Sequence, residues 1–134
     1  MIPSVKITAP HCRKDDRGVV VWPVPELLLR SGDVSNLHVP SIKPGAVRGN
    51  HYHAQGTEYL IVLCGPCKAS FFDRQTGESW EAVLTDNLPL LIEIPPNIVH
   101  AFKNTGTQDI MILCYESPAG TPDAQDTHRH VILS

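Results

Sequence analysis

The sequence predicts an all-β protein, folded as an antiparallel β-sandwich or barrel, of which the jelly roll is one form. Apolar and polar residues alternate with a period of two, as they do where one face of a strand is buried. The strand-like runs are short, and clusters of proline, glycine, asparagine and aspartate separate them. Many short strands joined by such turns favour two packed sheets or a closed barrel.

The expected elements follow one another along most of the chain. The strand-like runs are residues 5–8, 18–22, 37–42, 58–63, 68–72, 79–84, 90–94, 98–103 and 110–115. Turn signals separate them at residues 43–45, 65–66, 73–77, 95–97 and 104–106. The helix candidate is residues 25–30, a short segment that Gly32 would end. The polar stretch 117–130 is expected to cross the surface, and residues 131–133 to dock as an edge strand.

Size and charge limit the classes of function. A chain of 134 residues is one domain, and we expect its core at about residues 36–116 and a C-terminal tail at 117–134. The formal net charge is −3, and no basic stripe predicts nucleic-acid binding. No apolar run is long enough for a membrane-spanning helix, and residues 1–6 lack the features of a signal peptide. The cytosol is therefore the expected location.

The sequence Cys64-Gly65-Pro66-Cys67 has the spacing of a thioredoxin-type redox motif. That chemistry needs the first cysteine at a helix N-terminus, where the helix dipole lowers the thiol pKa. The flanking runs here are β-rich, and Gly-Pro between two strands is typical of a hairpin turn. We therefore expect two reduced thiols in a turn.

Three histidines and a glutamate have the spacing of a metal site. His51 and His53 are two residues apart, so they project from one face of a strand. Glu58 follows after a short glycine-containing loop that would return the next strand beside them, and His100 is the fourth candidate ligand. Imidazole and carboxylate ligands suit one divalent ion such as zinc, iron, manganese or nickel. The alternative is a buried polar cluster whose members bond one another, because such groups cannot be buried without partners.

Other polar and aromatic residues allow two interpretations. Arg48 could bind a phosphate, since its guanidinium group pairs with two oxygens at once, or it could form a surface ion pair. His128 and His130 repeat the His-x-His pattern but are expected to lie in the solvated tail. The larger aromatic side chains are expected to belong to the core rather than to a base-stacking surface: Trp22, Phe71, Phe72, Trp80 and Phe102.

Two motifs together resemble the cupin superfamily. The first runs from Gly45 through the His51-Tyr52-His53 segment and Glu58 to Gly65, and it fits the first cupin motif at every fixed position. The second is present as the segment 95–100 followed by Asn104. Asn97 replaces the usual glycine there, and asparagine tolerates a positive φ better than other side chains. The resemblance implies a single-domain cupin double-stranded β-helix, an antiparallel jelly-roll barrel.

A finer resemblance concerns nucleotide-linked keto sugars. The segment 48–53, with residues 94–96, is similar to the cupin domain of capsular-polysaccharide bifunctional enzymes and to dTDP-4-dehydrorhamnose 3,5-epimerases. The segment 16–18 is similar to the opening of those epimerases and of dTDP-sugar ketoisomerases. By this resemblance His51 is the catalytic histidine. The catalytic tyrosine of the epimerases corresponds to Ile112 here, and Tyr115 is the nearest tyrosine that could return the proton.

Three hypotheses for function follow. The first is an epimerase or isomerase of a nucleotide-linked keto sugar in polysaccharide biosynthesis, with Arg48 on the phosphate and His51 either as base or as metal ligand. The second is an iron-dependent dioxygenase of a small organic acid, since two histidines and a carboxylate also suit non-haem iron. The third is a cupin that binds a small ligand without chemistry. The resemblance, together with the symmetry that is commonest among oligomers, also predicts a homodimer.

Overall fold

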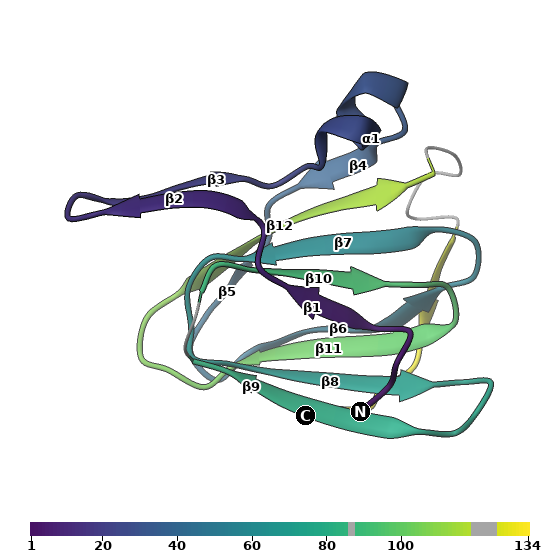
Figure 1. Ribbon diagram of the computed structural model, residues 1–134. Coiled ribbons are helices and arrows are strands. Elements are labelled where there is room, and N and C mark those ends of the chain that lie inside the picture. The colour runs from purple at the N-terminus through teal and green to yellow at the C-terminus, as the bar shows by residue number, and fades with distance from the viewer. Residues whose placement is uncertain (86–87, 119–125) are drawn as a thin grey trace.

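The computed structural model describes residues 1–85, 88–118 and 126–134, and it shows two antiparallel sheets packed face to face (Figure 1). The first sheet contains, in spatial order, β1 (Lys6–Thr8), β10 (Leu90–Ile94), β7 (Thr57–Val62), β12 (Ile110–Ser117) and β4 (Ser35–His38), and β5 (Ser41–Ile42) also pairs with β12. The second sheet contains β13 (Thr127–Arg129), β6 (Val47–His53), β11 (Ile98–Asn104), β8 (Cys67–Asp73) and β9 (Ser79–Leu84). This arrangement confirms the predicted all-β jelly roll.

The core lies between the two sheets and follows the predicted period of two. Leu60 and Val62 of β7 are buried there, as are Ile110 and Ile112 of β12. From the second sheet, Phe71 is among the largest buried side chains of the core. Alternate residues of the central strands therefore fill one apolar layer, and polar residues that share this inward face need partners inside it.

The sequence predicts the bounds of some strands correctly. The runs 79–84 and 90–94 have the bounds of β9 and β10. The run 37–42 is instead divided into β4 and β5. The sequence did not predict β2 (His11–Asp15), which is largely charged and exposed, or β6 as a complete strand, because polar residues occupy its inward face.

An exposed hairpin extends from the body of the barrel (Figure 1). It consists of β2 and β3 (Gly18–Trp22), which pair only with each other in the described residues. Trp22 on β3 is 44% exposed, so the prediction that it belongs to the core is wrong. The hairpin places this side chain away from the layer between the sheets, whereas Phe71 and Phe102 are buried in the core as expected.

The predicted helix is present as α1 (Glu26–Ser31). It ends at Gly32, whose φ of 70° is the left-handed C-cap conformation that glycine adopts without steric cost. Across residues 1–85, 88–118 and 126–134, no helix is long and apolar enough to cross a membrane.

The C-terminal region differs from the predicted tail. The stretch 119–125 lies outside the described residues, but residues 127–129 form β13 and pair with β6 beside the histidine segment. Residues 131–133 are not a strand as predicted. Instead the side-chain oxygen of Asn50 accepts hydrogen bonds from the backbone N–H groups of Ile132 and Leu133, at 2.9 and 3.0 Å.

The turn that contains Cys64 and Cys67 also differs from the prediction. It joins β7 to β8, and these strands belong to different sheets, so it is a crossover between sheets and not a hairpin. Both thiols are free, as expected; Cys64 is exposed and Cys67 is buried. Burial, with the nearby Cys64, raises the pKa of the Cys67 thiol to about 11, which makes it a poor nucleophile.

Asn104 joins the two motif segments at one end of the barrel. Its side-chain NH₂ donates to the carbonyl oxygens of Ile42 and Gln108 at 2.8 and 2.7 Å, and its Oδ1 accepts from Gly106 N at 2.9 Å. The backbone N–H of Gly45 donates to the Asn104 carbonyl oxygen. The Asn104 side chain is fully buried, so its bond to Ile42 is shielded from water, whereas the bonds to Gln108 and Gly106 are partly buried.

We therefore predict that Asn104→Ala lowers the free energy of unfolding by about 3 kcal/mol, because it removes three hydrogen bonds and leaves the buried Ile42 carbonyl oxygen without this partner. Urea denaturation measures this change. Thr107→Ala, in the same loop but exposed, is the control and should change stability by less than about 0.5 kcal/mol. Equal effects of the two substitutions would contradict this role for Asn104.

Candidate metal centre and cavity

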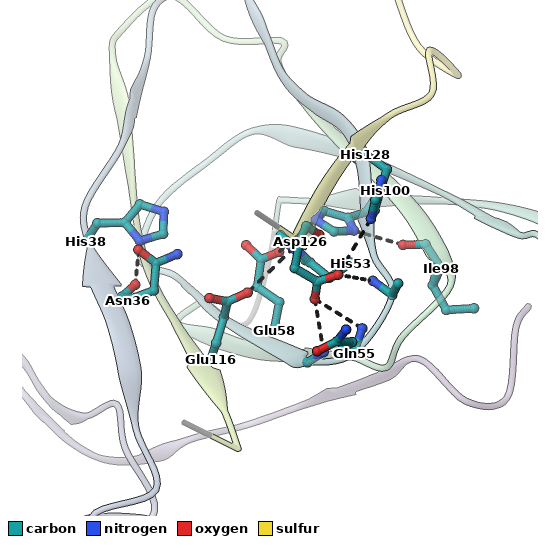
Figure 2. A network of polar contacts seen from close by, with 12 residues as sticks. Asn36, His38, His53, Gln55, Glu58, Ile98, His100, Glu116, Asp126 and His128 are labelled. Atoms are coloured by element: carbon teal, nitrogen blue, oxygen red, sulfur yellow. Dashed lines mark hydrogen bonds and ion pairs between the residues drawn. The ribbon is translucent and has the colours of Figure 1, made fainter. Parts of the chain in front are cut away.

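The four predicted ligand residues meet inside the barrel. His51 and His53 project from the inward face of β6, and Glu58 is the second residue of β7 after the intervening loop. His100 lies on β11 directly across from His51 in the strand register. One ligand atom from each of the four residues lies within 4.8 Å of all the others. The predicted convergence of these side chains is therefore confirmed, and Figure 2 shows three of them with their surroundings.

The turn before β11 places His100. Asn97 has a φ of 68°, so asparagine adopts the left-handed conformation that the motif normally assigns to glycine. Its backbone N–H donates to the His53 carbonyl oxygen at 2.8 Å, and its carbonyl oxygen accepts from Arg74 N at 3.2 Å. The expectation that the turn survives this replacement is confirmed.

Asp126 holds the loop between β6 and β7. The backbone N–H groups of Ala54, Gln55 and Gly56 donate to its carboxylate at 2.8, 3.1 and 3.3 Å (Figure 2). Burial alone would raise the pKa of this carboxyl group, but these three bonds and the neighbouring His53 hold the pKa below its usual value. The sequence did not identify Asp126, because some seventy residues separate it from the loop and no local pattern links them.

Hydrogen bonds fix the orientation of two imidazole rings. His53 Nδ1 lies 3.1 Å from the Asp126 carbonyl oxygen, and His100 Nδ1 lies 3.0 Å from the Ile98 carbonyl oxygen. A carbonyl oxygen only accepts, so each Nδ1 carries the hydrogen and each neutral ring has its lone pair on Nε2. Both Nε2 atoms face the same Glu58 oxygen, Oε2, at 2.7 Å for His53 and 2.9 Å for His100.

This arrangement needs positive charge. A carboxylate oxygen repels two imidazole lone pairs that point at it, so either the rings carry an additional proton or a cation lies among them. His100 Nε2 is buried and makes no hydrogen bond despite its closeness to Glu58. A buried nitrogen of this kind is the expected state of a metal ligand, and the donor set of three imidazoles and one carboxylate suits a divalent transition metal. The residues present therefore fit a metal.

The charge state of Glu58 agrees with this interpretation. Burial alone would raise the pKa of its carboxyl group, but the imidazoles of His100 and His53 hold the pKa well below its usual range. A second buried carboxylate lies close by: Glu116 of β12 pairs with Glu58 in the register, and its Oε1 is 3.6 Å from His53 Nδ1. The sequence did not single out Glu116, although its parity along β12 places it on the inward face.

A cavity of about 430 Å³ opens beside the cluster. His51, Glu58 and His100 lie on its wall together with several apolar residues: Ile42, Val47, Leu60, Phe102 and Ile112. Arg48 also lines it, and its Nε donates to the Ser41 carbonyl oxygen at 2.6 Å. The cavity thus combines a polar cluster, an apolar wall and one guanidinium group, which is typical of a small-molecule site.

Tyr115 lies away from this cavity. Its ring stacks on Tyr59 with centroids 5.1 Å apart, and its hydroxyl donates to the Pro23 carbonyl oxygen at 2.8 Å. Ile112 and Cys114 line the cavity instead. The prediction that Tyr115 returns a proton is therefore wrong, and the alternation along β12 already places residues 112 and 115 on opposite faces. Burial also raises the pKa of this hydroxyl well above its usual value.

The remaining predicted residues lie outside the cluster. His128 is in β13 and stacks on Tyr52, with ring centroids 5.0 Å apart, and His130 contacts Phe72. They therefore pack on the outer face of the second sheet and are not part of a solvated tail, although His128 is about half exposed. Residues 16 and 17 form the turn of the exposed β2–β3 hairpin and Gly18 begins β3, so the segment 16–18 lies outside the cavity.

Comparisons with known proteins identify the family. The family described as the polysaccharide biosynthesis C-terminal domain matches residues 13–128. This is most of the chain, and the chain therefore belongs to this family.

The chain is similar in sequence to two known bacterial proteins. It is 26% identical over 114 residues to the UDP-2-acetamido-2,6-beta-L-arabino-hexul-4-ose reductase of Pseudomonas aeruginosa; the match covers 85% of this chain but only 29% of that enzyme. It is 24% identical over 137 residues to the spore coat polysaccharide biosynthesis protein SpsL of Bacillus subtilis, covering 96% of this chain and 89% of that protein. The chain thus spans less than a third of the first relative and most of the second.

A solved structure shows the same fold. A mutant of the 3,4-ketoisomerase QdtA from Thermoanaerobacterium thermosaccharolyticum, in complex with TDP-4-keto-6-deoxyglucose, superposes with a TM-score of 0.75 at 18% identity. The match covers 97% of this chain and 90% of that one. This likeness agrees with the cupin jelly roll that the two sequence motifs predicted.

We predict one divalent ion per chain and its loss in His53→Ala, because that substitution removes one of the converging nitrogens. Elemental analysis of protein purified without chelator measures the metal content. His128→Ala is the matched control, because His128 belongs to the second His-x-His pattern but lies outside the ligand group. This substitution should leave the metal content unchanged. Wild-type protein with no bound metal would contradict the prediction.

Proposed function

We propose that this chain is an epimerase or isomerase that moves the proton next to the ketone of a nucleotide-linked keto sugar. One observation supports this function above the others: a cluster of three imidazoles and a carboxylate presents His51, His100 and Glu58 on the wall of a cavity large enough for a sugar ring. A ketone acidifies the proton on the neighbouring carbon, and the reaction then needs a base and a group that stabilises the enediolate oxygen.

The cavity residues have separate roles in this proposal. His51 lines the cavity and is half-buried, so it can face a bound sugar. It serves as base where its ring is not a ligand, and as a ligand where the cluster holds a divalent ion. When bound, such an ion supplies Lewis-acid stabilisation of an oxygen anion. Arg48 lines the same cavity, and its proposed role is to pair with a phosphate oxygen of the nucleotide diphosphate.

The relatives favour this reaction over the other two hypotheses. Their names concern polysaccharide biosynthesis and keto sugars joined to nucleotides. The dioxygenase hypothesis depends on the ligand set alone, and the binding hypothesis depends on the cavity alone. The apolar residues that line the cavity beside the cluster suit the carbon skeleton of a sugar that lacks some hydroxyl groups.

The exposed hairpin supports the proposal of a homodimer. Val19, Val20 and Trp22 of β3 are each 44–55% exposed. A two-stranded hairpin is marginally stable in water by itself, and an apolar one gains stability when a second surface covers it. A second copy related by two-fold symmetry would bury both hairpins at once.

We predict exchange of solvent deuterium into the sugar. When the protein is incubated in D₂O with dTDP- and UDP-4-keto sugars, NMR should show loss of the C3–H or C5–H signal. His51→Ala should slow this exchange by about 100-fold or more, because it removes a base or a ligand of the site. Absence of exchange with every such sugar would contradict the proposed reaction and favour the binding hypothesis.

We also predict that light scattering gives twice the chain mass of 14.7 kDa at micromolar concentration. Val20→Asp should shift the protein towards the monomer, because it places a charge in the proposed contact. Val83→Asp, on β9 and 69% exposed, is the control and should remain dimeric. A monomeric wild-type protein would contradict the proposed dimer.

A further inference from the structure

His38 lies on the cavity wall that faces the metal-ligand cluster. It is the last residue of β4 and pairs with Cys114 of β12 in the register, and Cys114 pairs in turn with Leu60 of β7. Directly paired residues of neighbouring strands point to the same face of a sheet. Cys114 and Leu60 line the cavity, and so does His38. The His38 side chain therefore belongs to the inner face of the first sheet. Of the three paired residues His38, Cys114 and Leu60, it is the exposed one.

A short hydrogen bond fixes the His38 ring. Its Nδ1 lies 2.6 Å from the carbonyl oxygen of Asn36, two residues earlier, and Figure 2 shows this contact. Asn36 has a φ of 52°, the left-handed conformation that asparagine tolerates. Because a carbonyl oxygen only accepts, Nδ1 carries the hydrogen, and in the neutral ring the lone pair is on Nε2. Nε2 is therefore the nitrogen that can take up a proton.

The other ionisable groups on the cavity wall have other partners or roles; the Cys114 thiol, for example, donates to the Ile112 carbonyl oxygen at 4.0 Å. His51, Glu58 and His100 belong to the ligand cluster. A guanidinium group donates hydrogen bonds but has no acceptor nitrogen, so Arg48 cannot act as a base. Among the described residues that line the cavity, His38 is the imidazole outside the cluster.

We propose that His38 is a catalytic acid–base residue. This proposal depends on the function proposed above. Nε2 takes the proton from the carbon next to the ketone, and the electron pair of the broken C–H bond forms the C=C bond of the enediolate. The carbonyl oxygen receives the negative charge. Protonation of carbon reverses these changes, so the sugar is neither oxidised nor reduced, and the proton that His38 accepts is available for return.

The position of His38 has a stereochemical consequence. His38 belongs to the first sheet, whereas His51 belongs to β6 of the second sheet, and the two sheets face each other across the barrel. A sugar ring between them would have one imidazole on each side. Inversion at a carbon requires removal of the proton from one face and delivery to the other, and this pair of residues supplies both faces. Where His51 is a metal ligand, His38 is the remaining base.

The test compares variants in NMR assays of product formation from the 4-keto sugar that shows exchange with the wild-type protein. His38→Gln keeps a polar side chain of similar length but cannot transfer a proton, and turnover should fall by about 100-fold or more. Its metal content and unfolding midpoint should equal those of the wild type, since His38 is exposed and outside the ligand group. The matched control His11→Gln, an exposed histidine outside the cavity, should keep wild-type turnover.

A second variant tests the proton-transfer role directly. His38→Ala should lose turnover and regain at least 10-fold of it when free imidazole is added, which a purely structural role would not produce. Turnover within twofold of wild type in His38→Gln, or His38→Ala turnover that imidazole does not change, would overturn the role of His38 while the proposed function stands. Absence of turnover in the wild type with every keto sugar would overturn both.

Discussion

The buried carboxylate of Glu58 is the constraint on which the rest of this site depends. It lies in the layer between two sheets, where an ionised group is costly unless it is paired with opposite charge and hydrogen bonds. Two imidazole Nε2 atoms approach one of its oxygens, and both rings are fixed from behind by backbone carbonyl groups. The lone pairs of the two Nε2 atoms and of the Glu58 oxygen therefore point at one another. Because they repel, a cation or protons must lie between them.

The surrounding fold holds the residues of this cluster in position. Strand β13 lies beside β6, and Asp126 just before it holds the loop that returns the chain from His53 to Glu58. The left-handed Asn97 turns the chain into β11 and brings His100 opposite His51. These contacts link segments far apart in the sequence. A rigid frame of this kind favours one fixed ligand geometry, which is what selective metal binding and catalysis both require.

The cavity combines polar and apolar side chains from both sheets, and this combination suits the proposed substrate, a sugar that is partly apolar. The second sheet contributes His51, His100 and Arg48 together with the apolar Val47 and Phe102. The first sheet contributes Glu58, the apolar Leu60 and Ile112 and, at the open end, His38. Charge that develops on a substrate oxygen would be stabilised at the cluster, while the carbon skeleton contacts the apolar wall. Membership in the polysaccharide biosynthesis C-terminal domain family gives a biological setting for such a substrate.

The sequence by itself determined the features that depend on local spacing. A period of two defines strands and an inward face, so residues 51 and 53 project together and a short loop returns Glu58 beside them. The tertiary structure alone decided which distant groups surround this cluster and its cavity. Asp126 and Glu116 lie beside the cluster and His38 lies on the cavity wall, all through pairing across many residues that no local pattern encodes. The exposure of Trp22 likewise depends on a hairpin that leaves the barrel, since an apolar run looks the same whether the core or another surface covers it.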